Sequence, residues 1–103
     1  MTLNQYQKRA RMYMQGNVKN DALYLALGLG GEVGEVLEKI KKEIRDGVFE
    51  KKALQKELGD VLWYLSQLSY AYDFDFEDVA KANLSKLQSR YKRGTINGEG
   101  DDR

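Results

Sequence analysis

The spacing of the apolar residues constrains this 103-residue chain most, because they recur at intervals of three and four and never alternate for long. An α-helix of about 3.6 residues per turn gives this spacing, whereas a strand gives a period of two. The sequence also contains no proline, a residue that would interrupt a helix. We therefore predict an all-α chain.

Capping and stop residues divide the predicted helical pattern into four segments. Thr2 and Gln5 have the spacing of a capping box, and Gly16 is placed to stop the first helix. Asp21 and Asp75 are candidate N-caps. Short connections between the helices are typical of antiparallel neighbours, so we expect a four-helix bundle-like domain. The expected helices cover residues 3–15, 21–45, 50–72 and 76–92.

The end of the chain differs in composition from the rest. Residues 94–103 read Gly-Thr-Ile-Asn-Gly-Glu-Gly-Asp-Asp-Arg, which is polar and rich in glycine. We predict one helical domain over residues 1–93, followed by a flexible polar tail over residues 94–103.

The third predicted helix has apolar residues on two faces. A leucine stripe occupies one face, and Trp63 and Tyr70 lie on the other. These two aromatic residues either pack beneath the first helix or form an interface between copies of the chain. A single core of this size stabilises a domain little, so we expect a homo-oligomer.

Missing residue types restrict the chemistry of the chain. It has no cysteine and no histidine, which excludes thiolate nucleophiles and the usual zinc ligands. Oxygen ligands remain, and these favour Mg²⁺, Mn²⁺ or Ca²⁺.

The charge and hydropathy of the chain also restrict its partners. The 17 basic residues nearly balance 16 acidic ones, so we expect no nucleic-acid partner. The longest apolar run, residues 22–29, is too short to span a membrane, and the N-terminus lacks a signal-peptide pattern. We expect a cytoplasmic protein with no membrane partner.

Two pairs of acidic residues share one pattern. Glu32 and Glu35 on the second helix, and Glu57 and Asp60 on the third, each lie three residues apart beside an apolar stripe. If the two helices are antiparallel, the pairs face each other across one groove. Two carboxylates about 4 Å apart repel by about 4 kcal/mol at an effective dielectric of 20. The acids therefore extend into solvent, hold protons or surround a divalent cation, and with no histidine present a carboxylate cage is the coherent interpretation.

Four glycines precede or separate the first acidic pair, namely Gly28, Gly30, Gly31 and Gly34. Each costs about 1 kcal/mol in a helix relative to alanine. Either another helix or a ligand approaches closely there, or a loop divides the second helix.

Polar and basic residues form one face of the fourth helix. Asn83, Lys86 and Arg90 recur at helical spacing, and Lys39 continues the acidic face of the second helix. Such residues usually form a solvated surface, but beside a metal site they are candidate phosphate ligands.

Three segments of the chain resemble the MazG-like all-α nucleoside triphosphate pyrophosphohydrolases. They are Gly-Glu-Val-Gly-Glu at residues 31–35, Glu-Leu-Gly-Asp-Val-Leu-Trp-Tyr at 57–64, and Asn-Leu-Ser-Lys-Leu-Gln-Ser-Arg-Tyr-Lys-Arg at 83–93. The resemblance implies a Mg²⁺-dependent enzyme, with Mn²⁺ as a substitute, that hydrolyses an NTP or dNTP between the α- and β-phosphates. The products are a nucleoside monophosphate and pyrophosphate, which suits clearing of the nucleotide pool. It also implies a homodimer or homotetramer. Gly31 departs from the pattern, since many relatives have an acid there.

The resemblance also assigns roles to individual residues. The metal ligands are Glu32, Glu35, Glu57 and Asp60. Glu32 or Glu35 is the catalytic base that accepts the proton of the attacking water. The phosphate contacts are Asn83, Lys86 and Arg90, and Lys39 is a further candidate. The candidates for stacking on the base are Tyr6, Tyr13, Trp63 and Tyr64, although aromatic residues more often pack in a core. The rival hypothesis is a non-catalytic helical module for oligomerisation or interaction, with solvated acids.

Overall fold

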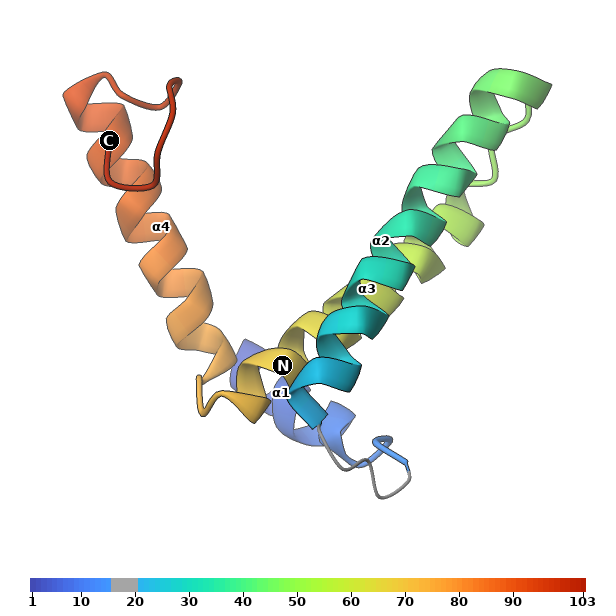
Figure 1. Cartoon of the computed structure of the whole chain (residues 1–103), viewed down its shortest axis with the longest axis horizontal. Helices are drawn as coiled ribbons and strands as arrows, with labels where there is room; N and C mark the ends of the chain where they lie inside the picture. The colour runs from blue at the N-terminus through green and yellow to red at the C-terminus, as the bar shows by residue number, and fades with distance from the viewer. Residues whose placement is uncertain (16–20) are drawn as a thin grey trace.

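The computed structural model of the chain describes residues 1–15 and 21–103. Within these ranges the chain is all-α, which confirms the predicted fold class of four helices (Figure 1). None of the described helices has the length and apolar character needed to cross a membrane. The helices are α1 (Leu3–Arg11), α2 (Asp21–Asp46), α3 (Lys51–Ala71) and α4 (Phe76–Arg93).

Helix α1 begins as predicted and ends earlier than predicted. Thr2 N donates to Gln5 Oε1 at 2.8 Å and Gln5 N donates to Thr2 Oγ1 at 3.0 Å, which confirms the capping box. After Arg11 the chain makes tighter turns, with Tyr13 N donating to the carbonyl three residues earlier. The helix therefore stops before residue 15, and the predicted stop at Gly16 lies outside the described residues.

Helix α2 runs without interruption through all four glycines, so the alternative of a loop dividing this helix is wrong. Asp21 is its first helical residue rather than the predicted N-cap. The helix ends where Gly47 adopts φ 72°, a left-handed conformation that glycine reaches without a steric cost. This turn reverses the chain, and α3 packs antiparallel beside α2.

The buried side chain of Gln7 joins three elements. Its Nε2 donates to the main-chain oxygens of Ser66 in α3 and Phe74 before α4, both at 3.0 Å. Its Oε1 accepts from Phe76 N, at the start of α4, at 3.1 Å. Gln7 therefore provides the partner of the Phe76 amide at the start of α4 and ties this amide to α1 and α3.

The start of α4 is capped from α1 rather than by its own N-cap. Asp75 occupies the predicted N-cap position, but its side chain makes no capping hydrogen bond. Asn4 Oδ1 instead accepts from Glu77 N at 2.9 Å. The junction of α1 with α4 thus replaces the local cap that the sequence indicated.

Replacing Gln7 with leucine should lower the free energy of unfolding by about 2–4 kcal/mol, because it removes three hydrogen bonds between elements and leaves the amide of Phe76 without its partner. Urea denaturation followed by circular dichroism measures this loss. The matched control is Gln55→Leu, at an exposed position on α3, which should change stability little. Equal stability of Gln7→Leu and wild type would contradict this role of Gln7.

The structure decides between the two interpretations of the second face of α3 for one of its two aromatic residues. Trp63 Nε1 donates to Ala10 O at 3.1 Å, and the Arg11 guanidinium lies 4.6 Å from the centre of the Tyr70 ring. Trp63 therefore packs beneath α1, whereas Tyr70 contacts Arg11 of α1 but remains 48% exposed, so only Trp63 loses its argument for an interface between copies.

The molecule has the shape of an open V (Figure 1). One arm is the α2–α3 pair, the other is α4, and α1 lies at the vertex. Within the described ranges α4 contacts α1 and α3 but makes no contact with α2. The radius of gyration is 16.4 Å, whereas a compact domain of 100 residues has about 13 Å.

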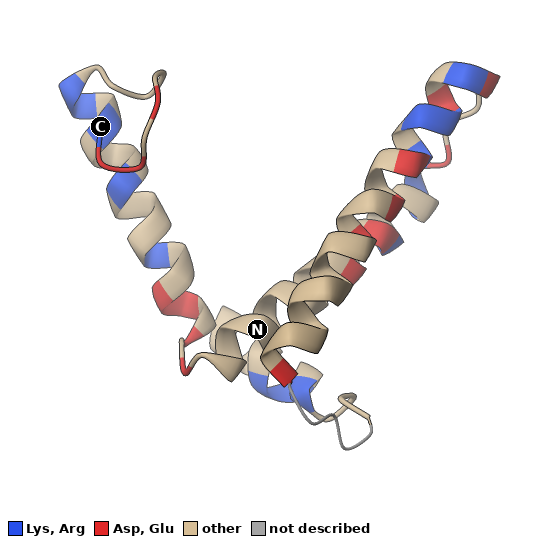
Figure 2. Cartoon of the chain, viewed as in Figure 1, with Lys and Arg blue, Asp and Glu red and all other residues tan. Residues whose placement is uncertain are grey.

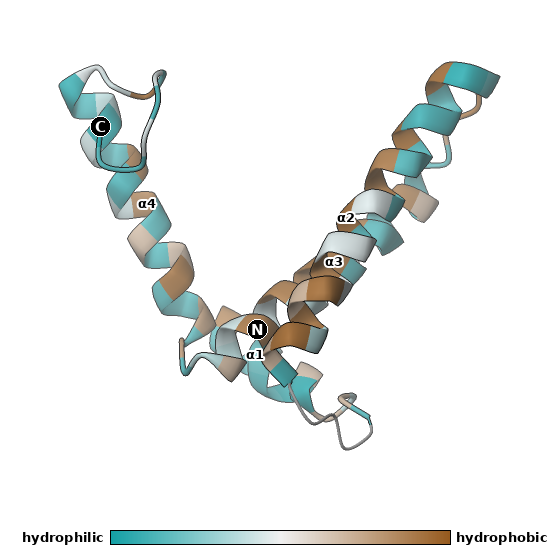
Figure 3. Ribbon diagram, viewed as in Figure 1, coloured by the Kyte–Doolittle hydropathy of each residue, from teal (hydrophilic) through white to brown (hydrophobic). Residues whose placement is uncertain are grey.

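Large apolar stripes remain exposed on both arms, as the brown segments of Figure 3 show. The buried hydrophobic residues are only Ala10, Leu25 and Phe76 among those described. The exposed stripes consist of Val33, Leu37, Ile40 and Ile44 on α2, Leu58, Leu62 and Leu65 on α3, and Leu84, Leu87 and Tyr91 on α4. The chain alone therefore leaves much of its apolar surface without a partner.

Candidate functional site

A close approach of α2 and α3 positions the candidate site. A Cβ atom placed on Gly28 would lie 2.1 Å from Cε1 of Tyr64. Only glycine permits the ring to lie against the helix there, which confirms the predicted close approach at this position. A Cβ on Gly30, Gly31 or Gly34 would meet no atom within 4 Å, so within one chain these glycines are not explained by packing.

Three of the four predicted acids converge one turn beyond this contact. Glu32 of α2 and Glu57 and Asp60 of α3 each offer a carboxylate oxygen, and the three oxygens lie within 4.8 Å of one another. Glu32 and Glu57 are half-buried and Asp60 is exposed. Figure 2 shows acidic residues in red along the α2–α3 arm that carries the three carboxylates. We call Glu32, Glu57 and Asp60 the acid cluster.

The acid cluster has an unfavourable electrostatic energy in the absence of a cation. The pKa of Glu32 is raised, first by desolvation and then by the negative charges of Asp60, Glu57 and Glu35. A divalent cation would remove this repulsion. The donor set consists of carboxylate oxygens, the ligands that Mg²⁺ and Mn²⁺ prefer, so the residues present fit such an ion.

Glu35 lies outside the acid cluster. Its side chain is exposed, and it acts on the cluster through its charge on Glu32. The carboxylate of Glu35 therefore does not join the three converging oxygens, and its assignment as a metal ligand or as a base stays a prediction.

Tyrosine hydroxyls also lie near the acid cluster. The pKa of Tyr6 is raised by desolvation and by the charge of Asp60, so the phenol of this predicted stacking residue is near the site. Desolvation also raises the pKa of Tyr64, with further contributions from Tyr24, its hydrogen-bond partner, and from Glu32.

Tyr64 was a candidate for stacking on the base, whereas Tyr24 was not selected from the sequence, although the spacing of both residues pointed to the site. Tyr64 follows Asp60 by four residues, and Tyr24 precedes Glu32 by eight, so each lies on the same helix face as an acid. Trp63, another predicted stacking residue, donates its indole N–H to Ala10 O in α1.

The predicted phosphate contacts do not meet the acid cluster within one chain. Asn83, Lys86 and Arg90 lie on α4, which makes no contact with α2 in the described structure. Lys86 and Arg90 instead bind Asp101 of the C-terminal segment. Lys39 lines a pocket at the α2–α3 turn together with Lys42 and Phe49.

An all-α chain with carboxylates converging from two antiparallel helices belongs to the class of helical proteins suited to binding a divalent cation. Comparison of the sequence with known families narrows this class. The profile of the MazG nucleotide pyrophosphohydrolase domain matches residues 21–95, and the chain belongs to this family. The match includes the acid cluster and the basic face of α4, and it confirms the resemblance found from the motifs.

A curated relative matches most of the chain, but its name states no activity. The chain is 48% identical over 85 residues to the Gene 37 protein of Mycobacterium phage L5, covering 78% of this chain and 75% of the relative. No solved structure gives a significant match.

Proposed function

We propose that this chain hydrolyses nucleoside triphosphates, ribo- or deoxyribo-, between the α- and β-phosphates and releases a nucleoside monophosphate and pyrophosphate. The convergence of Glu32, Glu57 and Asp60, in a chain of the MazG family, carries this proposal. The three carboxylates gain little from lying together unless a cation binds between them.

Each residue near the cluster has a proposed task. When bound, Mg²⁺ supplies charge neutralisation for the phosphates and Lewis-acid activation of water. Glu32, Glu57 and Asp60 hold the ion. Glu35 is exposed beside the cluster and outside it, so its carboxylate is free to accept the proton of the attacking water.

We further propose that a second copy of the chain closes the open V. The exposed surface of the chain is 8103 Å², whereas a compact monomer of this mass exposes about 5,900 Å². The excess of roughly 2,200 Å² per chain is typical of a subunit in an obligate dimer. The uncovered stripes on α2, α3 and α4 supply the apolar surface for such an interface.

A second copy would also complete the site. Because α4 does not reach α2 of its own chain, its basic face is free to lie over the acid cluster of the other copy. Asn83, Lys86 and Arg90 would then contact phosphate oxygens that the metal leaves free. The proposed enzyme therefore has active sites shared between two chains.

Analysis of the reaction products tests the proposed activity. The full chain is incubated with ribo- and deoxyribonucleoside triphosphates and Mg²⁺, and the products are followed by phosphorus NMR. Equal amounts of nucleoside monophosphate and pyrophosphate are expected. Release of orthophosphate would show cleavage at another bond, and the absence of any product would favour the rival hypothesis of a non-catalytic helical module.

Binding of Mg²⁺ should raise the melting temperature of the chain. At an ion concentration about ten times Kd, mass action stabilises the folded state by about 1.4 kcal/mol, or roughly 5–10 °C for a chain of this size. Differential scanning calorimetry measures the shift against NaCl of equal ionic strength. The control Glu43→Gln removes a carboxylate from α2 outside the cluster and should keep the shift. An equal response of wild type to both salts would count against the metal site.

A further inference from the structure

The segment that follows α4 folds into a closed loop. Gly98 and Gly100 adopt φ 137° and 84°, conformations that residues with a Cβ rarely reach. The Arg103 guanidinium donates to the main-chain oxygens of Thr95, Ile96 and Gly100 at 3.1, 2.8 and 2.6 Å. These bonds draw the end of the segment back toward its start. We call residues 94–103 the return loop.

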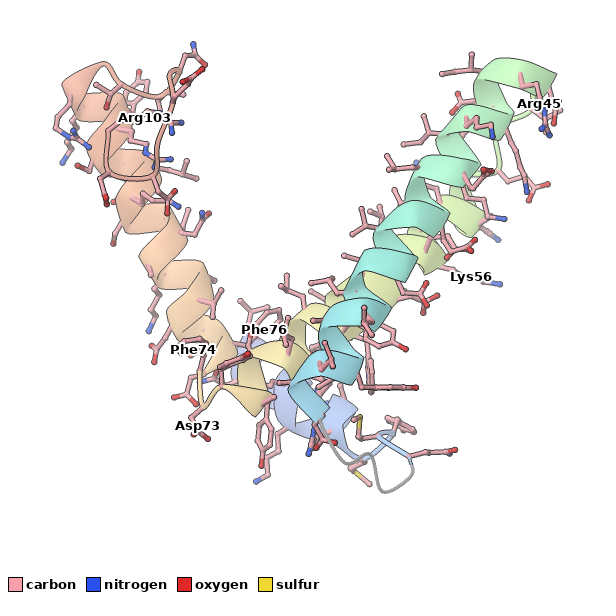
Figure 4. The ribbon with its side chains drawn as sticks, viewed as in Figure 1. Arg45, Lys56, Asp73, Phe74, Phe76 and Arg103 are labelled. Atoms are coloured by element: carbon pink, nitrogen blue, oxygen red, sulfur yellow. The ribbon has the colours of Figure 1, made fainter. Side chains whose placement is uncertain are left out.

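The return loop is fixed to α4 from outside the loop as well. Arg93 Nη2 donates to the main-chain oxygen of Arg103 at 2.7 Å. In Figure 4 the labelled Arg103 lies beside the last turns of α4. The glycines that suggested a flexible tail therefore also permit the reversal that brings this segment onto the helix.

The return loop places one acid on the basic face of α4. Lys86 Nζ lies 3.0 Å from Asp101 Oδ1, and Arg90 Nη2 lies 3.2 Å from the same oxygen. Arg90 Nη2 also donates to the main-chain oxygen of Asp101. Two oxygens of Asp101 thus occupy the donors of the two cations assigned to phosphate binding.

The environment of these groups suits a reversible contact. Arg90 is only 5% exposed, and its Nε has no hydrogen-bond partner. The Asp101 side chain, in contrast, is 81% exposed. Solvent therefore reaches the Asp101 side of the ion pair, and a ligand with several negative charges can replace this single carboxylate.

We propose that the return loop is an internal competitor for the phosphate-binding face, with the carboxylate and carbonyl of Asp101 standing where phosphate oxygens bind Lys86 and Arg90. This inference rests on the proposed function, because it assumes that these two residues contact the triphosphate. The loop leaves the face when substrate binds. It therefore weakens substrate binding without taking part in the chemical step, and it sets a substrate concentration below which the enzyme works slowly.

Two substitutions of opposite charge test the competition. Asp101→Asn removes the competing carboxylate, and Arg103→Ala removes the bonds that close the loop. Each should lower the KM for the triphosphate by about threefold, the scale of an exposed charged contact, and leave kcat unchanged. Asp101→Asn raises the net charge of the chain by one, and Arg103→Ala lowers it by one. A KM that falls in both variants therefore excludes a general effect of net charge.

The control is Asp102→Asn, which makes the same change of charge at the next residue. Asp102 is exposed and forms no hydrogen bond or ion pair within the described part of the chain. The KM of Asp102→Asn for the triphosphate should match that of wild type. A KM that follows net charge, falling for both Asp→Asn variants and rising for Arg103→Ala, would overturn the proposal.

Binding of inorganic tripolyphosphate, measured by calorimetry without Mg²⁺ on the same full-length variants, separates this proposal from the enzymatic one. Tighter binding by Asp101→Asn and Arg103→Ala than by Asp102→Asn supports the competition even if no variant hydrolyses a nucleotide. Hydrolysis with no difference in KM or in tripolyphosphate binding overturns the competition and leaves the proposed function standing. Failure of every variant to bind tripolyphosphate also overturns it.

Discussion

Replacing Glu57 with glutamine should lower kcat/KM for pyrophosphate release by about a thousandfold, equivalent to about 4 kcal/mol of transition-state stabilisation. Glu57 is half-buried in the acid cluster and supplies one of the three carboxylates proposed to hold the ion. Glutamine keeps the length and helix propensity of the side chain but removes its charge. The measurement is the initial rate of pyrophosphate release over a range of substrate concentrations.

The same substitution should leave the metal-free chain at least as stable as wild type. Glu57 lies among like charges that raise the pKa of Glu32, so removing its charge relieves repulsion. Loss of activity together with unchanged or higher stability separates a metal ligand from a structural residue. Glu43→Gln is the control for activity, and full turnover by Glu57→Gln would refute the assigned role.

The core of the candidate site was predictable from sequence because it depends on local helix geometry. Glu57 and Asp60 lie one turn apart, and the antiparallel pairing of two helices with a short connection brings Glu32 to them. The position of Glu35 was less predictable, since a side chain at the edge of a groove depends on the rotation of α2 about its axis. The close contact of Gly28 with Tyr64 sets that rotation.

Features that depend on tertiary contacts were not predictable in the same way. The sequence alone suggests that Gln7 is a solvated polar residue in a short helix. In the structure it is buried and joins α1, α3 and α4. The contact of Asp101 with Arg90 needs a loop whose closure depends on Arg103. The periodicity of α4 predicts a helix but does not specify its direction, and the structure directs it away from α2.

Placing aspartate at both Leu84 and Leu87 should dissociate the proposed dimer. These residues are 58% and 40% exposed in one chain and lie on the same face of α4. Burying two carboxylates in an apolar interface should raise the dimer dissociation constant at least about a hundredfold. Sedimentation velocity measures the change, and Ser85→Asp, about a third of a turn away on the same helix, is the control that should remain dimeric.

The dissociated variant should also lose pyrophosphate release although its acid cluster is intact. Without a second copy, the basic face of α4 does not lie over an acid cluster. Refolding two inactive variants together decides whether sites are shared. Glu57→Gln lacks a working acid cluster, and Lys86→Ala lacks a phosphate contact on α4. In a mixed dimer, one of the two sites combines the intact acid cluster of the Lys86→Ala chain with the intact α4 of the Glu57→Gln chain. The mixture should recover about a quarter of wild-type activity if the chains pair at random. A mixture that stays inactive while forming mixed dimers would place each site within a single chain, and α4 would then have to close onto its own α2.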